Sequence, residues 1–483
     1  MSYKKETITR GLFWNLMERW GVQFTQFVLQ LILARILSPE HYGTLQLMVV
    51  FTTLANVFIQ TGFSSALIQN KEVTDEDFSS VFWLTLGIAV IIYVGFFFAA
   101  PLIAAFYKMP ELVAPFRVLS LVLLPGALNS VQLARIKRRM DFKKIFRSNV
   151  AAIIIAGLVG ILLACMGAGI WALVAQTLTN TTVACIVMWF SVKWQPRFVF
   201  NTSRVKILFA FGWKLLVSHL LETLYQDIQS LIIGKKFNSG TLGYYTRGKQ
   251  FPHLLINSIN SAVQNVMLPA MSADQDNKAK VKSLMRNSIS LSSYIIFPMM
   301  AGLAGVAEPM VKLLLTEKWL PCVPYLQICC FCYAFYPIHS CNLQAINAVG
   351  RSDVYLKLEI IKKIYGVLVL VAAIVFFDSA IELAMSGIVI SLISTFVNAS
   401  PNKKLVDYSY LEQLRDILPA FVLSFVMLAV VLLIGTLKIH TLALLALQIA
   451  AGVAIYVGLS AALRLPPFIK LLGFLKKILK KRM

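Results

Sequence analysis

Residues Phe209–Met271 read FAFGWKLLVSHLLETLYQDIQSLIIGKKFNSGTLGYYTRGKQFPHLLINSINSAVQNVMLPAM, and this stretch decides the fold that we expect for the chain. It holds two apolar segments, each long enough to cross a bilayer, joined by a tight turn at Phe237–Gly243. Both segments nevertheless carry polar and ionisable side chains. An ionisable group at membrane depth costs roughly 2.5–3.5 kcal/mol and normally faces a bundle interior or water. We therefore interpret the two segments as the lining of a polar path through a membrane protein.

The polar side chains gather on one face of each segment. At about 100° per residue, they cover roughly 160° of the first segment and about 140° of the second. The first stripe comprises His219, Glu222, Thr223, Gln226, Asp227 and Gln229, and the second comprises Arg247, Gln250, His253, Asn257, Asn260, Ser261 and Gln264.

The composition of the whole chain predicts an all-α polytopic membrane protein. Of its 483 residues, 58% are hydrophobic and only 14% are charged, which excludes a disordered chain and an ordinary soluble enzyme. Apolar segments of about 20 residues recur from end to end, giving about fourteen transmembrane helices. Their predicted centres are Gln23, Leu54, Ala89, Leu124, Ala156, Ala184, Leu221, Leu254, Met300, Ala334, Tyr365, Ser391, Met427 and Gly452.

The net charge of +23 reflects membrane topology rather than nucleic-acid binding. Lys and Arg concentrate in alternate short loops, such as Arg135–Arg147 and Lys403–Arg415, and in the C-terminal tail, as the positive-inside rule requires. We expect both termini to be cytoplasmic, no nucleic-acid partner, and a first span that serves as its own insertion signal.

An internal repeat divides the chain. LILARILSPEHYG (Leu31–Gly43) lies over LIIGKKFNSGTLG (Leu231–Gly243) at an offset of 200 residues. The second copy starts an even number of spans after the first, so both insert in the same orientation, a plan that recurs in transporters. We predict a six-helix N-terminal lobe (1–200), a parallel six-helix C-terminal lobe (201–405) and an extra helix pair with a basic cytoplasmic tail (406–483).

Three cationic side chains are candidates for substrate binding. Arg247, Lys249 and His253 lie in the outer half and middle of one helix without an acidic neighbour on it, which suits a phosphate-bearing or acidic substrate. Alternatively, Arg247 and Lys249 extend to the outer interface, and His253 is a hydrogen-bonded core residue. Arg19 is the candidate cation of the first lobe.

Carboxylates and amides complete the candidate site. Glu222 and Asp227 either couple transport to an H⁺ or Na⁺ gradient or pair with nearby cations. The amides either hydrogen-bond sugar hydroxyls or join helices to one another. They are Asn257, Asn260, Gln264, Gln23, Gln26 and Gln60.

No catalytic or metal-binding pattern stands out. The chain lacks G-x-S-x-G, Walker and H-E-x-x-H motifs, so we expect neither an enzyme nor a cofactor. Cys329, Cys330 and Cys332 lack companion ligands and are interpreted as packing residues. The acidic run Asp75–Asp77 is interpreted as a solvated loop.

Four motifs resemble those of Wzx-type polysaccharide flippases, especially the colanic-acid-exporter-like branch of the polysaccharide transporter family. They are LARILSPEHYGTLQLM (Leu33–Met48), GFSSALIQ (Gly62–Gln69), SLIIGKKFNSGTLGYYTRGKQFPHL (Ser230–Leu254) and VMLPAMS (Val266–Ser272). The resemblance covers about Thr9–Arg351. Similar exporters tend to read Asn-x-Asp where this chain has Asp227-Ile228-Gln229, so the chain departs from the family pattern at this position.

The resemblance implies a two-lobed, alternating-access transporter of the bacterial inner membrane, with the fold of multidrug and toxin extruders (MATE-like). Its cargo would be an undecaprenyl-pyrophosphate-linked oligosaccharide used for lipopolysaccharide, O-antigen, capsule or exopolysaccharide. A polysaccharide polymerase and a chain-length regulator would be partners, beside membrane lipids. The alternatives are a multidrug or cation antiporter of the same fold, which should have an acid-dominated cavity, and a membrane-embedded polymerase or ligase, which usually needs a large outer loop.

Overall fold

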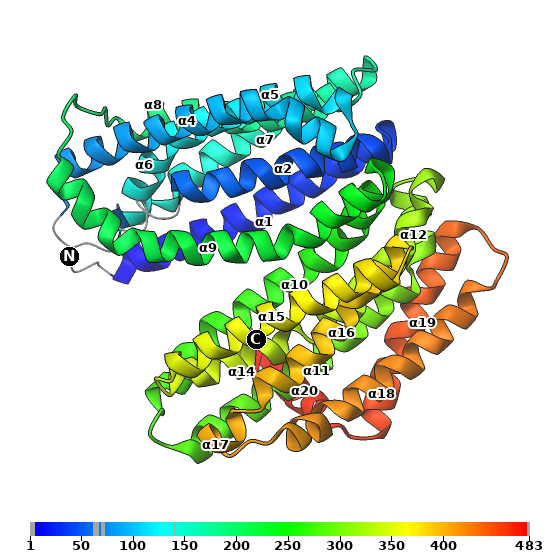
Figure 1. Ribbon diagram of the computed structural model, residues 1–483. Coiled ribbons are helices and arrows are strands. Elements are labelled where there is room, and N and C mark those ends of the chain that lie inside the picture. The colour runs from blue at the N-terminus through cyan, green and yellow to red at the C-terminus, as the bar shows by residue number, and fades with distance from the viewer. Residues whose placement is uncertain (1–4, 61–66, 69–72, 140, 481–483) are drawn as a thin grey trace. The chain divides into compact units, whose positions relative to one another are not determined.

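The computed structural model describes the backbone of residues 5–60, 67–68, 73–139 and 141–480. Side chains are described from residue 21 onward within these ranges, except at 211, 258, 262 and 474–480. All regular structure in this part of the chain is helical (Figure 1). The helices form two compact units, Met1–Gly243 and Tyr244–Met483. The lobes expected from the repeat have different bounds and stay a prediction.

The first unit contains long helices joined by short turns. α7 packs against both α1 and α8, while α2 packs against α6 and α9. Its elements are α1 (Lys5–Ile36), α2 (Pro39–Gln60), α4 (Asp75–Tyr107), η1 (Pro110–Leu112), α5 (Val113–Leu119), η2 (Ser120–Val122), α6 (Leu123–Arg139), α7 (Phe142–Cys165), α8 (Ile170–Val192) and α9 (Thr202–Lys236).

The second unit is built around α11, which packs against α13, α14 and α18. α10 (Ser239–Ala273) begins in the first unit and continues into the second. The other elements are α11 (Lys278–Gly305), α12 (Ala307–Leu314), η3 (Glu317–Cys322), α13 (Val323–Ala334), α14 (Tyr336–Ala348), α15 (Ser352–Phe376), α16 (Ala380–Ala399), α17 (Asn402–Val406), α18 (Tyr410–Gly435), α19 (Thr441–Ala462) and α20 (Pro466–Lys480).

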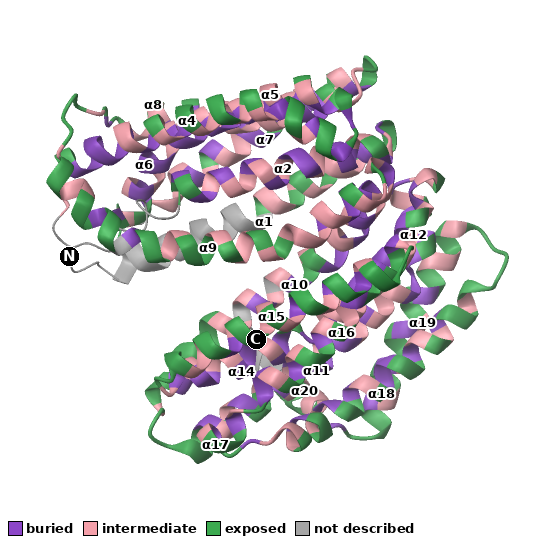
Figure 2. Ribbon diagram, in the orientation of Figure 1, coloured by how far each residue is buried: buried purple, intermediate pink, exposed green. Residues whose placement is uncertain are grey.

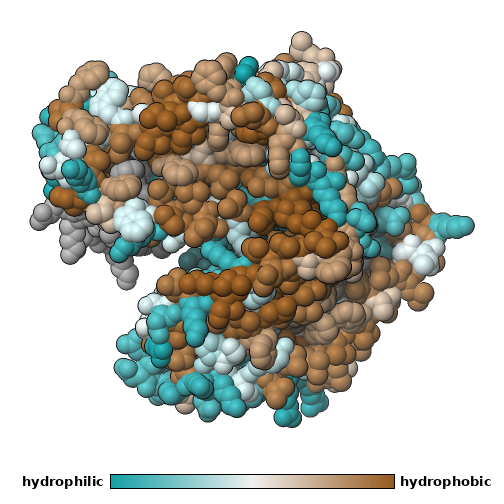
Figure 3. Space-filling view, viewed as in Figure 1, coloured by the Kyte–Doolittle hydropathy of each residue, from teal (hydrophilic) through white to brown (hydrophobic). Residues whose placement is uncertain are grey.

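The chain is a multi-pass membrane protein. Within the described residues, 10 helical segments are long and apolar enough to cross a membrane, or up to 11 if the two bent halves of α9 form one span. Apolar side chains accordingly cover long stretches of the outer surface (Figure 3). The described part of α1 contributes only a shorter apolar stretch, Gly21–Ile36, and the described parts of α10 and α15 are not apolar enough to count as spans. The count of fourteen therefore stays a prediction. All fourteen predicted centres lie within helices.

Two equivalent helix starts cross each other in the first unit. A Cβ atom added to Gly43 at the start of α2 would lie 1.7 Å from the carbonyl oxygen of Ser239, and one added to Gly243 would lie 2.0 Å from that of Pro39. These contacts are reciprocal under the offset of 200 residues. The Asn238 side chain accepts a 2.8 Å hydrogen bond from the Thr241 amide and so caps α10. The repeat found in the sequence therefore corresponds to a close backbone contact that only glycine permits.

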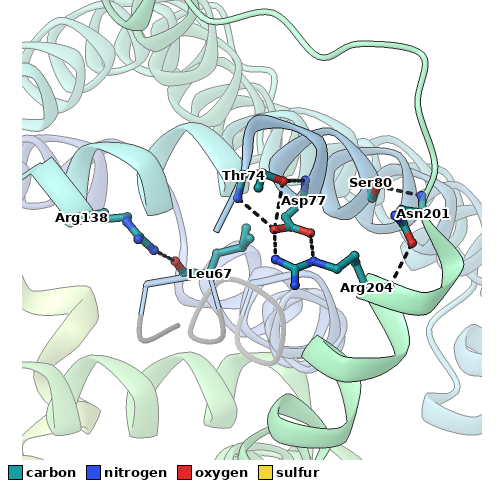
Figure 4. A network of polar contacts seen from close by, with 7 residues as sticks. All are labelled: Leu67, Thr74, Asp77, Ser80, Arg138, Asn201 and Arg204. Carbon is teal, nitrogen blue, oxygen red and sulfur yellow. Dashed lines mark hydrogen bonds and ion pairs between the residues drawn. The ribbon is translucent and has the colours of Figure 1, made fainter. Parts of the chain in front are cut away.

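An ion pair fastens the beginning of α9 to the beginning of α4 (Figure 4). Arg204 donates from Nε and Nη2 to the two carboxylate oxygens of Asp77, at 2.9 and 2.8 Å. Asp77 also closes a capping box with Thr74, and its side chain is only 2% exposed. The interpretation of Asp75–Asp77 as a solvated loop is therefore wrong for Asp77. A buried carboxylate needs such partners, because unpaired burial is costly.

Hydrogen bonds also hold the linker between α8 and α9 against the first turns of α4. Ser80 Oγ accepts from the Asn201 amide at 3.0 Å, and the Asn201 side chain accepts from the Arg204 amide at 3.1 Å, which caps α9 (Figure 4). Trp83 Nε1 donates to the Arg197 carbonyl at 2.9 Å. These contacts hold the beginning of α9, the helix that carries Glu222 and Asp227, against the beginning of α4.

Candidate substrate-binding site

The helix α10 carries most of the candidate residues, and a glycine sets how closely it packs in the second unit. A Cβ atom at Gly248 would lie 2.8 Å from the Cys322 carbonyl oxygen and 2.8 Å from the Leu326 amide nitrogen. The backbone of α10 therefore touches the junction of η3 and α13. This contact directs the neighbouring residue, Arg247, toward η3.

Arg247 is buried inside the second unit. Its residue exposure is 3%, its Nη1 donates to Gln250 Oε1 at 2.6 Å, and its guanidinium carbon lies 5.3 Å from the centroid of the Trp319 ring. A guanidinium over an indole face gains cation–π attraction. In this conformation the side chain is packed among protein groups.

Lys249, His253 and Asn257 are more accessible. Lys249 is half-buried, with Nζ 5.9 Å from the centroid of the Tyr245 ring. His253 is exposed, packs its ring 5.8 Å from that of Tyr333, and is hydrogen-bonded to Asn257 Nδ2 at 3.2 Å. This part of α10 presents a cationic and hydrogen-bonding surface.

Asn260 and Gln264 meet α14 instead. Ser340 donates to Asn260 Oδ1 at 2.5 Å and accepts from Gln264 Nε2 at 3.3 Å. Asn260 is 8% exposed and Ser340 6%. Here the amides hold two helices together, one of the two roles expected for them.

The carboxylates lie on α9 in the first unit. Glu222 is half-buried and accepts a 2.9 Å hydrogen bond from Gln226 Nε2, one helical turn away. Asp227 is also half-buried. The predicted stripe of the first segment thus includes an acid hydrogen-bonded along the helix.

The amides of the first repeat lie on α1 and α2. Gln23 is half-buried, whereas Gln26 and Gln60 are exposed. Gln60 Nε2 lies 3.4 Å from Asn56 Oδ1, and Asn56 faces Gly126 of α6. The side chain of Arg19 lies outside the described part, as does the Gly62–Gln69 motif apart from Leu67 and Ile68.

Burial divides the candidate residues of α10 into two groups. Figure 2 shows that buried, half-buried and exposed positions alternate along the helices. Arg247 and Asn260 are buried against η3 and α14, while Lys249, His253 and Asn257 remain accessible to different degrees. Trp319 and Ser340, the partners of the buried part, were not predicted. Their only signal in the sequence is a polar or aromatic residue in an otherwise apolar segment.

The cysteines offer no alternative site. Within the described residues, no group of three or more His, Cys, Asp or Glu side chains is arranged to hold a metal ion. Cys329 and Cys330 are buried and Cys332 is half-buried, all as free thiols. Thiols enclosed in this way resemble small apolar packing residues.

Comparison with known proteins identifies the relationship. The chain is 26% identical over 349 residues to the succinoglycan biosynthesis transport protein ExoT of Rhizobium meliloti, covering 72% of this chain and 71% of the relative. It is 24% identical over 368 residues to the lipopolysaccharide biosynthesis protein WzxC of Escherichia coli, covering 75% of this chain and 74% of the relative.

Solved structures share the fold. The lipid II flippase MurJ in an inward closed conformation matches with a TM-score of 0.76 at 14% identity, over 94% of this chain and 98% of that one. An inward-facing multidrug-resistance MATE transporter matches with a TM-score of 0.58 at 15% identity, over 85% and 95%. The resemblance noted in the sequence is confirmed at the level of the family, whose model matches residues 32–324, more than half of the chain. The chain belongs to the polysaccharide biosynthesis protein family.

Proposed function

We propose that this protein is a flippase that moves undecaprenyl-pyrophosphate-linked oligosaccharide repeat units from the cytoplasmic to the periplasmic leaflet of the bacterial inner membrane. The proposal rests on membership of the polysaccharide biosynthesis protein family, joined to the fold shared with the lipid II flippase MurJ. Two relatives are named for succinoglycan transport and lipopolysaccharide biosynthesis, which supports a saccharide cargo.

The surface of α10 carries the chemical argument. Lys249 and His253 are accessible cations or potential cations on a span-length helix that is too polar to pass as an ordinary span. They would attract the pyrophosphate, and Asn257 would hydrogen-bond sugar hydroxyls. Arg247 would contribute a buried positive charge, because its guanidinium is held in place by Gln250 and Trp319. A second group of amides, on α1 and α2, would contribute from the first repeat.

Alternating access would expose these groups to each side in turn. Glu222 would couple the cycle to an H⁺ or Na⁺ gradient, and its hydrogen bond with Gln226 would change when it binds a cation. Asp227 is the second candidate for this role. Both termini would be cytoplasmic, and the transported units would pass to a polymerase and a chain-length regulator.

The proposal is tested in proteoliposomes with a fluorescent prenyl-pyrophosphate-linked oligosaccharide whose exposed fraction is read by quenching from outside. We expect movement by the intact protein, and its loss in a Lys249→Ala/His253→Ala variant. Lys357→Ala, which removes an exposed cation from α15, is the matched control and should retain movement. Movement of an organic cation but not of the lipid-linked substrate would overturn the proposal in favour of an antiporter.

Coupling needs a separate measurement. We expect Glu222→Gln, which preserves the shape of the side chain, to make movement independent of an imposed ion gradient. Unchanged gradient dependence in this variant would refute the role of Glu222 but not the identity of the cargo.

A further inference from the structure

The C-terminal helix α20 has the pattern of a helix that lies in a membrane surface. Its sequence is PPFIKLLGFLKKILK, and its 15 residues would extend about 22 Å, too short for a hydrocarbon core of about 30 Å. At about 100° per residue, its four lysines and Gly473 fall within an arc of roughly 120°. Most of the apolar side chains occupy the opposite arc, as in interfacial amphipathic helices.

One side of the described part of α20 contacts the rest of the second unit. α20 packs against α11, and Lys470 Nζ donates to Asn287 Oδ1 at 2.5 Å. Just before the helix, Leu465 is buried at 9% exposure. On the apolar arc, Phe468 and Leu471 are half-buried, whereas Leu472 is 39% exposed. Leu472 therefore projects from the apolar face without cover from this part of the chain.

A positively charged cleft lies beside the start of α20. It has a volume of about 300 Å³ and is lined by α11, α18 and α20, with Arg286, Arg415 and Lys470 as its cations. Its one acid, Asp416, already accepts 2.7 Å hydrogen bonds from Arg286 Nη2 and from Tyr408 Oη. The cleft thus keeps an excess of positive charge next to an amphipathic basic helix.

We propose that α20 docks into the headgroup layer of the membrane and that the adjacent cleft binds the phosphate of an anionic phospholipid. The two features require the same partner. An apolar face flanked by lysines fits a bilayer surface, and lysines near such a surface are attracted to anionic lipids. The exposed Leu472 would enter the boundary of the acyl chains, while Lys470 and Arg415 would face phosphate groups.

A cysteine introduced at one of two adjacent positions tests the orientation in the full-length protein. Cys165, the one exposed native cysteine within the described residues, is first replaced by serine. An environment-sensitive probe is then attached at Leu472→Cys or, as the matched control, at Gly473→Cys, where an added Cβ meets open space. In vesicles of phosphatidylethanolamine and phosphatidylglycerol, we expect a blue shift and quenching by lipid-borne quenchers at position 472 only. Equal emission and equal access to an aqueous quencher at both positions would overturn the proposal.

Charge variants test the choice of lipid. With the probe at position 472, the blue shift should be larger in vesicles with phosphatidylglycerol than in vesicles with phosphatidylcholine. We expect Lys476→Ala/Lys477→Ala/Lys480→Ala to remove this difference, whereas Lys403→Ala/Lys404→Ala should keep it. High salt should abolish the difference too, since the screening length falls from about 8 Å at 0.15 M to about 3 Å at 1 M.

Lipid retained on the detergent-purified protein is measured by native mass spectrometry. Lys470→Ala/Arg415→Ala should lose bound phosphatidylglycerol. A blue shift that appears without lipid and grows with protein concentration would assign α20 to contact with a second copy of the chain and refute lipid docking.

Discussion

The crossing of α2 and α10 predicts a severe effect for the substitution Gly43→Ala. The added methyl group would lie 1.7 Å from Ser239 O, 2.6 Å from Ser239 C and 2.9 Å from Gly243 N. All three are backbone atoms, so no rotation of a side chain relieves the overlap. The two helix starts must separate if alanine is to fit.

The size of the effect follows from this geometry. Non-bonded atoms rest at about 3.5 Å, so an atom held at 1.7 Å requires a shift of roughly 2 Å. Adding atoms to a packed interior typically costs about 1–3 kcal/mol when side chains can adjust. Because the backbone must move here, we expect Gly43→Ala to lower the free energy of unfolding by about 3 kcal/mol or more, and Gly243→Ala to lower it by a similar amount.

Two glycines of α4 provide matched controls. An added Cβ meets nothing within 4 Å at Gly87 or at Gly95. Alanine there should be neutral or stabilise the helix by up to about 1 kcal/mol, because glycine is the poorer helix former. The assay is the apparent melting temperature of each purified variant in one detergent, followed by export of polysaccharide in cells that lack the native protein.

We expect Gly43→Ala to melt well below the native protein and Gly87→Ala to melt at or slightly above it. Equal melting temperatures for these two variants would refute the reasoning, since they would mean that the α2–α10 contact is loose enough to accept a side chain. Gly234→Ala should give an intermediate result, because its close neighbours belong to the flexible side chains of Leu47 and Leu242.

Three further substitutions are tested by the same melting assay. Arg204→Ala should lower the free energy of unfolding by about 1.5–3 kcal/mol, because Asp77 loses its charged partner. A double-mutant cycle with Asp77→Asn should give a coupling energy of about 0.5–3 kcal/mol. Additive effects of the two substitutions would contradict the pairing in Figure 4. Ser340→Ala leaves the buried oxygen of Asn260 without this donor and should cost about 1–3 kcal/mol, against less than about 0.5 kcal/mol for the exposed Ser400→Ala. Lys235→Met removes a cation that contacts the Phe106 carbonyl near the end of α4 and should cost about 0.3–1 kcal/mol, a loss that high salt should reduce.

The sequence predicted the helices well because membrane insertion imposes a local rule. A span needs about 20 apolar residues, so its centre can be located without knowing what it contacts. α10 carries too many polar groups to pass as an ordinary span, yet its helical periodicity and its turn before Gly243 were enough to predict it. The prediction of a buried or wet polar face required only the cost of exposing such groups to lipid.

The environment of single side chains was harder to predict because periodicity gives a face but no neighbour. Arg247 belongs to the predicted stripe, yet its burial depends on Trp319, which is 72 residues away in the chain, and on the close approach at Gly248. Asp77 was interpreted as solvated because Arg204 is 127 residues distant. The tail was treated as a basic segment, whereas Pro466–Lys480 is a helix.

The glycine crossing connects the repeat to the geometry of the fold. Gly43 meets Ser239, and Gly243 meets Pro39, so each contact maps onto the other when 200 is added to or subtracted from the residue numbers. Reciprocal contacts of this kind occur where two equivalent segments meet across a local two-fold axis. Equivalent atoms approach each other closely only near such an axis, and a side chain there would clash with the backbone of the other segment. The same close contact therefore requires glycine at both positions. The double substitution Gly43→Ala/Gly243→Ala should lower the free energy of unfolding by less than the sum of the two single substitutions, because a separation that admits one methyl group also makes room for the other.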